Sequence, residues 1–157
     1  MAITRDKTGC GPTNGVISIN SLNRVYVLSN TVDLTGETSL VTTDIYQSLA
    51  IPADTQVLMV KVEILKPAVG SALTCTVGDG SGANSWDGAV DLMAAAGTFT
   101  HSTAGTDAYQ VTGATAVGGC GMFYDAADSI DIVLATVTAI TAGPKFRVSA
   151  VCADFNS

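Results

Sequence analysis

Apolar residues recur at every second position over residues 55–66, and this alternation constrains the fold of the chain more than any other feature. A period of two places alternate side chains on opposite faces of a β-strand. The side chains expected to point into a core are Leu58, Val60, Val62 and Ile64, and those expected to point outward are Met59, Lys61, Glu63 and Leu65. A strand of this length would span roughly 40 Å at ~3.3 Å per residue, so a bulge or bend is expected within it.

Shorter segments with strand character occur along the rest of the chain. They lie at about residues 25–28, 40–49, 72–78, 98–100, 109–112, 128–136 and 145–152, with turns rich in Gly, Asp and Asn between them. Residues 89–96 are the one segment with helical spacing of apolar residues, confined between Gly88 and Gly97. Many short strands with almost no helix predict an all-β fold, and we expect an antiparallel β-sandwich of jelly-roll type. We expect an extended N-terminal arm with a first short strand at residues 1–34, and the sandwich body at residues 35–157.

Charge is unevenly divided between these two parts. The chain of 157 residues has a net charge of −7 and only 13% charged residues. Residues 1–30 carry Arg5, Lys7 and Arg24 against Asp6, a net +2, which leaves −9 for the remainder. An acidic body repels nucleic acid and anionic membranes, so we expect neither as a partner. The basic residues of the arm are predicted to contact a partner protein, and the alternative is a frayed terminus.

Hydropathy and cysteine usage limit the setting in which the protein acts. The longest apolar run, residues 57–65, contains Lys61 and Glu63, which predicts no membrane span. The first residues lack the apolar core of a signal peptide, so synthesis in a cytoplasm is expected. Cys75 and Cys152 lie on predicted inward strand faces and are interpreted as small buried apolar residues. Cys10 and Cys120 lie in Gly-rich segments and are left as free, buried at an interface, or paired, with pairing less expected in a cytoplasm.

The sequence offers little that would support catalysis or metal binding. His101 is the only histidine, and no nucleophile elbow, phosphate-binding loop or zinc-protease motif is present. Residues 79–88 resemble a calcium loop at first sight, but Ser81 and Ala83 occupy its third and fifth positions and no bidentate Glu stands at its twelfth. An irregular cation site is the weaker alternative to turn-capping aspartates, with the candidates Asp79, Asp87 and Asp91. We therefore expect no cofactor, no metal and no enzymatic activity.

A second acidic group, Asp125, Asp128 and Asp131, leads into a predicted strand. Paired carboxylates can hydrolyse glycosides, but the aromatic residues that usually line such a cleft are sparse here. We interpret Asp125 and Asp128 as turn residues and place Asp131 on the outward face of the strand. The single tryptophan, Trp86, is expected either to anchor a loop on the core or to form an interface hot spot.

Four short motifs resemble a module of tailed-phage and prophage virion proteins. They are IPADTQVLMV at residues 51–60, LTCTVGDG at 73–80, WDGAVDL at 86–92 and ADSIDIVL at 127–134, and the resemblance covers about residues 50–154. The resemblance implies a head-decoration (cement) subunit, a homotrimer on the capsid exterior whose N-terminal arm clamps the major capsid protein. A carbohydrate- or receptor-binding β-sandwich of a head fibre or tail is the alternative that it leaves open.

Apolar residues expected on outward strand faces are the candidates for contacts between subunits. Low charge and exposed apolar side chains suit subunit–subunit packing. The interface candidates on this ground are Met59, Leu65 and Val133, together with Trp86.

Overall fold

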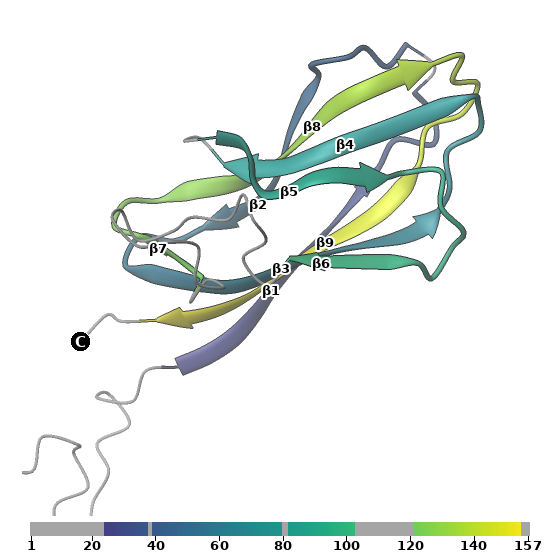
Figure 1. Cartoon of the computed structure of the whole chain (residues 1–157). Coiled ribbons are helices and arrows are strands. Elements are labelled where there is room, and N and C mark those ends of the chain that lie inside the picture. Colours follow the sequence, from purple (N-terminus) through teal and green to yellow (C-terminus); the bar gives the residue numbers. More distant parts are fainter. Residues whose placement is uncertain (1–23, 38, 80–81, 103–120, 155–157) are drawn as a thin grey trace, which may run out of the picture.

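The computed structural model describes residues 24–37, 39–79, 82–102 and 121–154, which form nine β-strands (Figure 1). The strands are β1 (Arg24–Asp33), β2 (Ile45–Ile51), β3 (Thr55–Lys66), β4 (Ala72–Asp79), β5 (Gly82–Asp91), β6 (Phe99–Ser102), β7 (Met122–Tyr124), β8 (Asp128–Thr138) and β9 (Lys145–Asp154). No helix occurs in the described part of the chain, and consequently none that could cross a membrane.

The strands form two antiparallel sheets that face each other. Sheet A has the order β1-β9-β3-β6, with β7 pairing beside β6 on the same edge of β3. Sheet B has the order β2-β8-β4-β5. Apart from β7, eight strands thus make two four-stranded sheets, which is also the strand count of a jelly roll. The predicted all-β, antiparallel β-sandwich is confirmed.

Strict alternation builds the core between the sheets. Along β9, the side chains of Phe146, Val148, Ala150 and Cys152 have no exposed surface, whereas their neighbours in sequence face outward. Side chains from β8 and β4 meet them from sheet B, including Ile130, Ile132 and Leu73. Cys75 and Cys152 are free and fully buried, as predicted.

A β-bulge in β3 corrects one detail of the predicted alternation. Val57 pairs with Cys152 and Met59 with Val151, so Leu58 is the extra residue between them. Val57 is therefore fully buried in place of Leu58, which is partly exposed. The bulge that the length of this strand predicted is confirmed, and it reverses the faces of residues on its N-terminal side.

Three other expectations differ from the structure. The helical spacing at residues 89–96 gives no helix, because β5 continues to Asp91 and turns follow it. The strands β5 and β7 were not predicted, and the strand expected at residues 109–112 lies outside the described residues. The strand β1 is longer than expected and pairs with β9 without a register shift from Arg24 to Asp33. The ordered sheet therefore begins at Arg24, within the segment that the sequence assigned to the arm.

Candidate protein interface

The outer face of sheet A is organised in rows of side chains that cross its strands. Residues directly opposite each other in antiparallel strands present their side chains on the same face. The register of β1, β9 and β3, extended by β7 and β6, places five such rows side by side. Two adjacent rows at one end are uncharged and mostly apolar, and the three at the other end are mostly polar or charged, with Phe99 at the edge of one of them.

The two apolar rows form a patch that we call the apolar end. The first row runs from Val25 through Ala153 and Gln56 to Phe123, and the second from Val27 through Val151 to Met59. Val25, Val27 and Phe123 are 66%, 64% and 51% exposed. These seven residues carry no formal charge. Val25 and Val27 are exposed apolar neighbours on one strand, whereas Ala153, which lies in the row between Val25 and Phe123, is only 6% exposed.

Several charged groups at the opposite end of the same face are paired with one another. Lys145 Nζ lies 2.9 Å from Asp33 Oδ2, and this partner holds the pKa of the Asp33 carboxyl far below its usual range. Arg147 and Lys61 both approach Glu63 Oε2, at 3.9 and 3.5 Å.

Hydrogen bonding and ring contacts complete this polar end. The Ser29 and Ser149 hydroxyls are 3.0 Å apart. Lys61 Nζ also lies 4.5 Å from the centre of the Phe99 ring. Most charged groups of the polar end are thus paired with one another, and Lys66, opposite Lys145, is the exception among the described residues of these rows.

The apolar end lies where the chain enters and leaves the sandwich. The strand β1 begins there and β9 ends there, beside the start of β3 (Figure 1). The sequence before residue 24 therefore connects directly to this patch.

The predicted interface residues fall in four different places. Met59 lies in the apolar end and is half-buried. Leu65 lies on the same strand at the polar end, at a second register shift between Ile64 and Lys66. Val133 is on sheet B, where it pairs with the exposed Ile45. Trp86 is only 2% exposed and belongs to the core, which is the first of the two roles considered for it.

Of the three basic residues predicted to contact a partner, one lies within the described part of the chain. Arg5 and Lys7 lie outside the described residues, and Arg24 is the first residue of β1. His101 lies in β6, opposite Lys61.

A buried polar network ties the two sheets together next to Trp86. Trp86 Nε1 donates a hydrogen bond of 3.1 Å to the Tyr124 hydroxyl, which in turn donates one of 3.0 Å to Asp79 Oδ2. The other carboxylate oxygen of Asp79 accepts from the Gly82 amide and from Ser85 Oγ. Burial raises the pKa of Tyr124 well above its usual range. Asp79 is thus a structural acceptor at the turn between β4 and β5.

The three candidate metal ligands are not brought together. Asp91 pairs with Thr74 on β4. Thr74 precedes Asp79 by five residues on that strand, which corresponds to a distance of ~16 Å along β4. Asp87 and Asp91 each accept a hydrogen bond from a nearby backbone amide, of Ala89 and Met93. No group of three metal-ligating side chains occurs among the residues that the structure describes.

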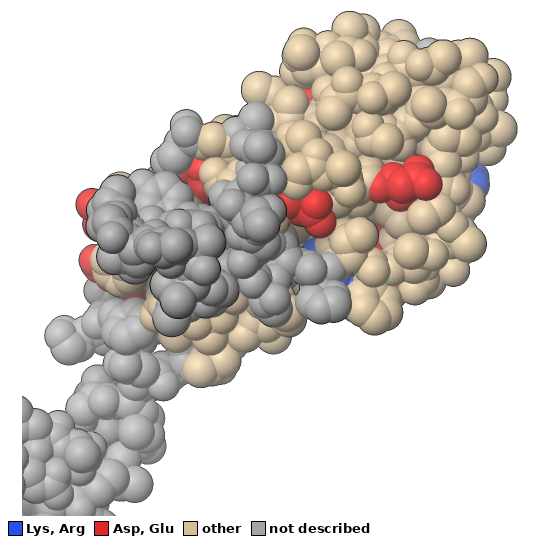
Figure 2. Space-filling model, viewed as in Figure 1, with Lys and Arg blue, Asp and Glu red and all other residues tan. Residues whose placement is uncertain are grey.

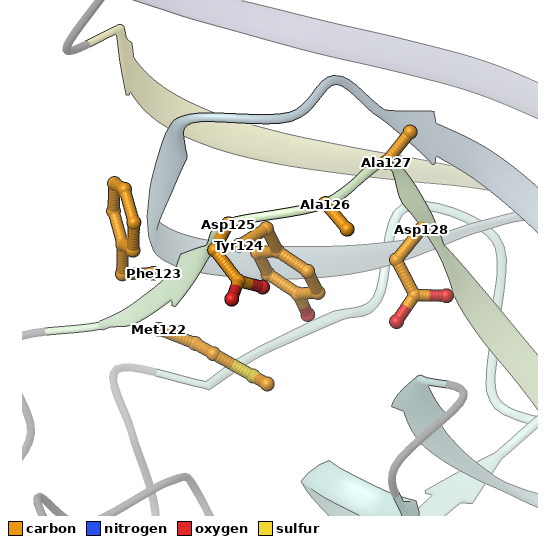
Figure 3. A pocket seen from close by; sticks show the side chains of 7 residues that line it. All are labelled: Met122, Phe123, Tyr124, Asp125, Ala126, Ala127 and Asp128. Atoms are coloured by element: carbon orange, nitrogen blue, oxygen red, sulfur yellow. The ribbon is translucent and has the colours of Figure 1, made fainter.

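The second acidic segment lines a hollow of about 510 Å³ formed by residues 122–128. Figure 3 shows the carboxylates of Asp125 and Asp128 beside the Tyr124 ring, with Phe123 pointing the other way. Asp131 lies on the outward side of β8, as predicted, but is only 8% exposed. Its burial raises its pKa, and the negative charges of Asp128 and Asp79 act in the same direction. Asp125 and Asp128 are the two carboxylates of this lining, and Tyr124 supplies the aromatic ring beside them.

Sequence reasoning missed most of the apolar end. Val25 and Val27 alternate with Tyr26 and Leu28, so their outward position could have been found had the segment not been assigned to the arm. Phe123 gave no such signal, because its strand is only three residues long.

Comparison with known proteins adds the fold class. No protein-family model matches the sequence, and no curated protein matches it. A chain of the capsid of Ralstonia phage GP4 is similar at a TM-score of 0.63 and 16% identity, over 85% of this chain and 86% of that one. A chain of the cyanophage Pam1 capsid asymmetric unit is similar at a TM-score of 0.59 and 17% identity, over 98% of this chain and 99% of that one. A chain of the acidic stable capsid of Helicobacter pylori bacteriophage KHP30 is similar at a TM-score of 0.54 and 13% identity, over 85% of this chain and 89% of that one.

At these identities the likeness shows the fold alone. The chain has the two-sheet β-sandwich fold of chains found in those three phage capsid structures.

Proposed function

We propose that this chain is a structural, non-enzymatic protein of a tailed-phage virion, and that it is a decoration (cement) subunit on the capsid exterior. The observation that carries the proposal is the similarity of fold, over nearly the whole length of both chains, to a chain of the cyanophage Pam1 capsid asymmetric unit. Two further phage capsids contain chains of similar fold.

The surface of the body supports a role in binding protein rather than nucleic acid. The net charge of the chain is −7, and uncharged residues predominate on the face shown in Figure 2. An acidic surface repels the phosphate backbone, whereas an uncharged apolar surface suits contact with another protein. The exposed residues of the apolar end provide such a surface.

In this proposal the basic arm holds the major capsid protein and the body forms a homotrimer. Arg5, Lys7 and Arg24 supply the positive charge of the arm. Three arms on one trimer bind in a linked manner, so weak single contacts add up to tight attachment. The trimer then bridges neighbouring capsomers and opposes the pressure of packaged DNA. Synthesis takes place in the host cytoplasm, before attachment to the capsid.

The fibre or tail alternative is less well supported. It places binding of a sugar or a receptor on the loops of residues 78–121, and Trp86, within that segment, is 2% exposed. Its indole nitrogen is also engaged by Tyr124.

The test is co-sedimentation of the purified full-length chain with capsids assembled from the major capsid protein of the same genome. We expect saturable binding that weakens by at least tenfold when Arg5 and Lys7 are both changed to Glu. The matched control is Lys66→Glu, a charge reversal at an exposed position at the end of β3, which should leave binding unchanged. Absence of binding by the wild-type chain would overturn the decoration proposal, and equal loss in the control would overturn the role of the arm.

A further inference from the structure

We propose that Asp87 is a site of spontaneous covalent modification, at which the folded chain rearranges from aspartate to isoaspartate. The sequence contains two Asp-Gly pairs, Asp79-Gly80 and Asp87-Gly88. An aspartate rearranges most readily when glycine follows it, because glycine has no Cβ to hinder the approach of its own nitrogen to the carboxyl group. This reactivity is independent of the proposed function.

The rearrangement needs no cofactor and no reactant other than water. The backbone nitrogen of Gly88 attacks Cγ of Asp87, an N–Cγ bond forms, and a carboxyl oxygen leaves as water with the amide proton. Water then adds to either carbonyl of the resulting five-membered succinimide ring. When the original peptide bond is the one that opens, the chain stays connected through Cγ. The product therefore has an unchanged mass and one additional carbon in its backbone.

The local geometry at Asp87 favours this attack. Asp87 Oδ1 accepts a 3.1 Å hydrogen bond from the Ala89 amide, and this bond closes a ring that encloses the Gly88 nitrogen. The carboxyl group is thereby held next to the nitrogen that attacks it. Asp87 is half-buried and Gly88 is exposed, so water reaches the site.

The backbone at this position lies outside the regular strand pairing. The strand β5 is the outermost strand of sheet B as described, and its pairing with β4 is shifted at this point. Gly88 and Ala89 both lie opposite the single residue Thr76. Two residues opposite one form a β-bulge, in which the extra residue is left out of the ladder. Gly88 can therefore change its conformation without breaking the neighbouring strand pairs.

Asp79 also precedes a glycine, but the fold fixes its carboxylate. Its Oδ2 accepts a 3.0 Å hydrogen bond from the Tyr124 hydroxyl. Its Oδ1 accepts from the Gly82 amide at 3.0 Å and from Ser85 Oγ at 3.2 Å. Because the side chain is only 5% exposed, turning the carboxylate towards the following nitrogen would break these bonds without replacement by water. The folded chain thus protects this first Asp-Gly pair.

Asp91 separates the contribution of the turn from that of glycine. Its Oδ1 accepts a 2.8 Å hydrogen bond from the Met93 amide, the same arrangement as at Asp87. The next residue, however, is Leu92, which is fully buried and donates its amide to the Leu73 carbonyl at 3.0 Å. That nitrogen is already engaged and is flanked by a bulky side chain. We therefore expect reaction at only one of these three aspartates.

The modification alters β5 directly beside the core. Trp86, the preceding residue, is 2% exposed and belongs to the core cluster. The additional backbone carbon displaces the pairing of position 87 with Val77. We expect modified protein to unfold at a lower urea concentration than fresh protein. Asp87→Glu should show no such loss on storage, because its longer side chain would have to form a six-membered ring.

The experiment stores the full-length chain at 37 °C, folded in buffer and unfolded in guanidinium chloride. Isoaspartate is located by peptide mass mapping with electron-transfer fragmentation, which breaks the additional backbone bond. In the unfolded chain, Asp79 and Asp87 should rearrange at similar rates. In the folded chain, we expect Asp87 to keep its rate within about threefold and Asp79 to slow by at least about tenfold, because only Asp79 requires unfolding to react.

Equal slowing of both aspartates on folding would overturn the inference. Isoaspartate at Asp91 at the same rate as at Asp87 would also overturn it, because glycine would then have no part in the reaction. Asp87→Glu is the matched variant, and it should remove the isoaspartate signal from its own peptide while leaving that of Asp79 in the unfolded chain unchanged. An isoaspartate signal that persists in this peptide would show that another residue had been modified.

Discussion

The Tyr124 hydroxyl donates a 3.0 Å hydrogen bond to Asp79 Oδ2 across the two sheets of the sandwich. Tyr124 belongs to β7 on sheet A, and Asp79 ends β4 on sheet B. Both residues are buried, at 4% and 5% exposure. A charged acceptor in such a place requires its donors, so this pair fixes the separation of the sheets at the end of the molecule where the apolar end also lies.

Removal of this hydroxyl should therefore weaken the fold. Tyr124→Phe deprives Asp79 of a donor and Trp86 of an acceptor, and a hydrogen bond to a charged group contributes roughly 1.5–3 kcal/mol. We expect the free energy of unfolding, measured in urea, to fall by about 2 kcal/mol. Tyr46→Phe is the control, because the Tyr46 hydroxyl makes no hydrogen bond in the described part of the chain. Equal losses for the two variants would contradict the role of the network.

The stability of the fold should depend on pH through Asp131. Burial raises the pKa of this carboxyl above 3.8, and the Ser129 hydroxyl at 2.6 Å offsets the rise only in part. The native state therefore favours the protonated form, and stability from this group is full below pH 3.8 and lost as pH rises through the native pKa. Asp131→Asn removes this loss. We expect it to be more stable than the wild type at pH 7, with the difference shrinking towards pH 4.

Urea titrations at pH 4, 5, 6 and 7 measure this difference directly. Asp125→Asn, at an exposed position of the adjoining turn, serves as the control and should show no comparable trend. An Asp131→Asn variant that is less stable than the wild type at pH 7 would show that the carboxylate is needed in its charged form.

Three glycines provide a graded test of backbone constraint. A Cβ at Gly121 would lie 2.0 Å from the Val57 carbonyl oxygen, beside the β3 bulge, and its φ is +82°. Gly97 has a φ of +87° but open space around it, and Gly36 has open space without that conformation. Substitution by Ala should cost about 1 kcal/mol at Gly97 and less than about 0.5 kcal/mol at Gly36.

At Gly121 the clash adds to the backbone strain. We expect Ala there to cost more than ~3 kcal/mol or to prevent folding, because the nearest atoms are backbone and cannot rotate away. Thermal unfolding of the three variants side by side measures the series. Equal effects at positions 97 and 121 would mean that the bulge of β3 yields to the added methyl group.

The buried thiols should be unreactive in the folded protein. Burial raises the pKa of Cys75 to about 12 and that of Cys152 to about 11. At pH 8 the thiolate fraction of Cys75 is then about 10⁻⁴, compared with ~0.1 at the unshifted value of 9.0. We expect both residues to be alkylated only after addition of denaturant, as read by peptide mass mapping. Fast labelling of either residue in buffer would indicate that the sandwich opens locally.

Much of the fold followed from local patterns, because alternation is a property of the sequence alone. The strand at residues 55–66 was predicted with its observed bounds, and β8 and β9 began at their predicted residues. The inward positions of Phe146, Val148 and Ile132 are those that the period of two requires.

Local patterns failed where pairing decided the structure. The strand β5 contains Gly and several polar residues and has low strand propensity, yet pairing with β4 holds it in an extended form. The three residues of β7 pair with the start of β3 and bring Phe123 beside Gln56, from a segment distant in sequence.

The sequence by itself determined the fold class, the alternation of its strands and the acidic charge of the body, since each depends only on residue types and their spacing. Tertiary structure alone decided that Val25, Val151, Met59 and Phe123 lie on one face, because the register of strands distant in sequence brings them together. It also separated Asp79 from Asp91 and buried Trp86, because hydrogen bonding across the sheets and packing in the core act on residues in space and not in order of sequence.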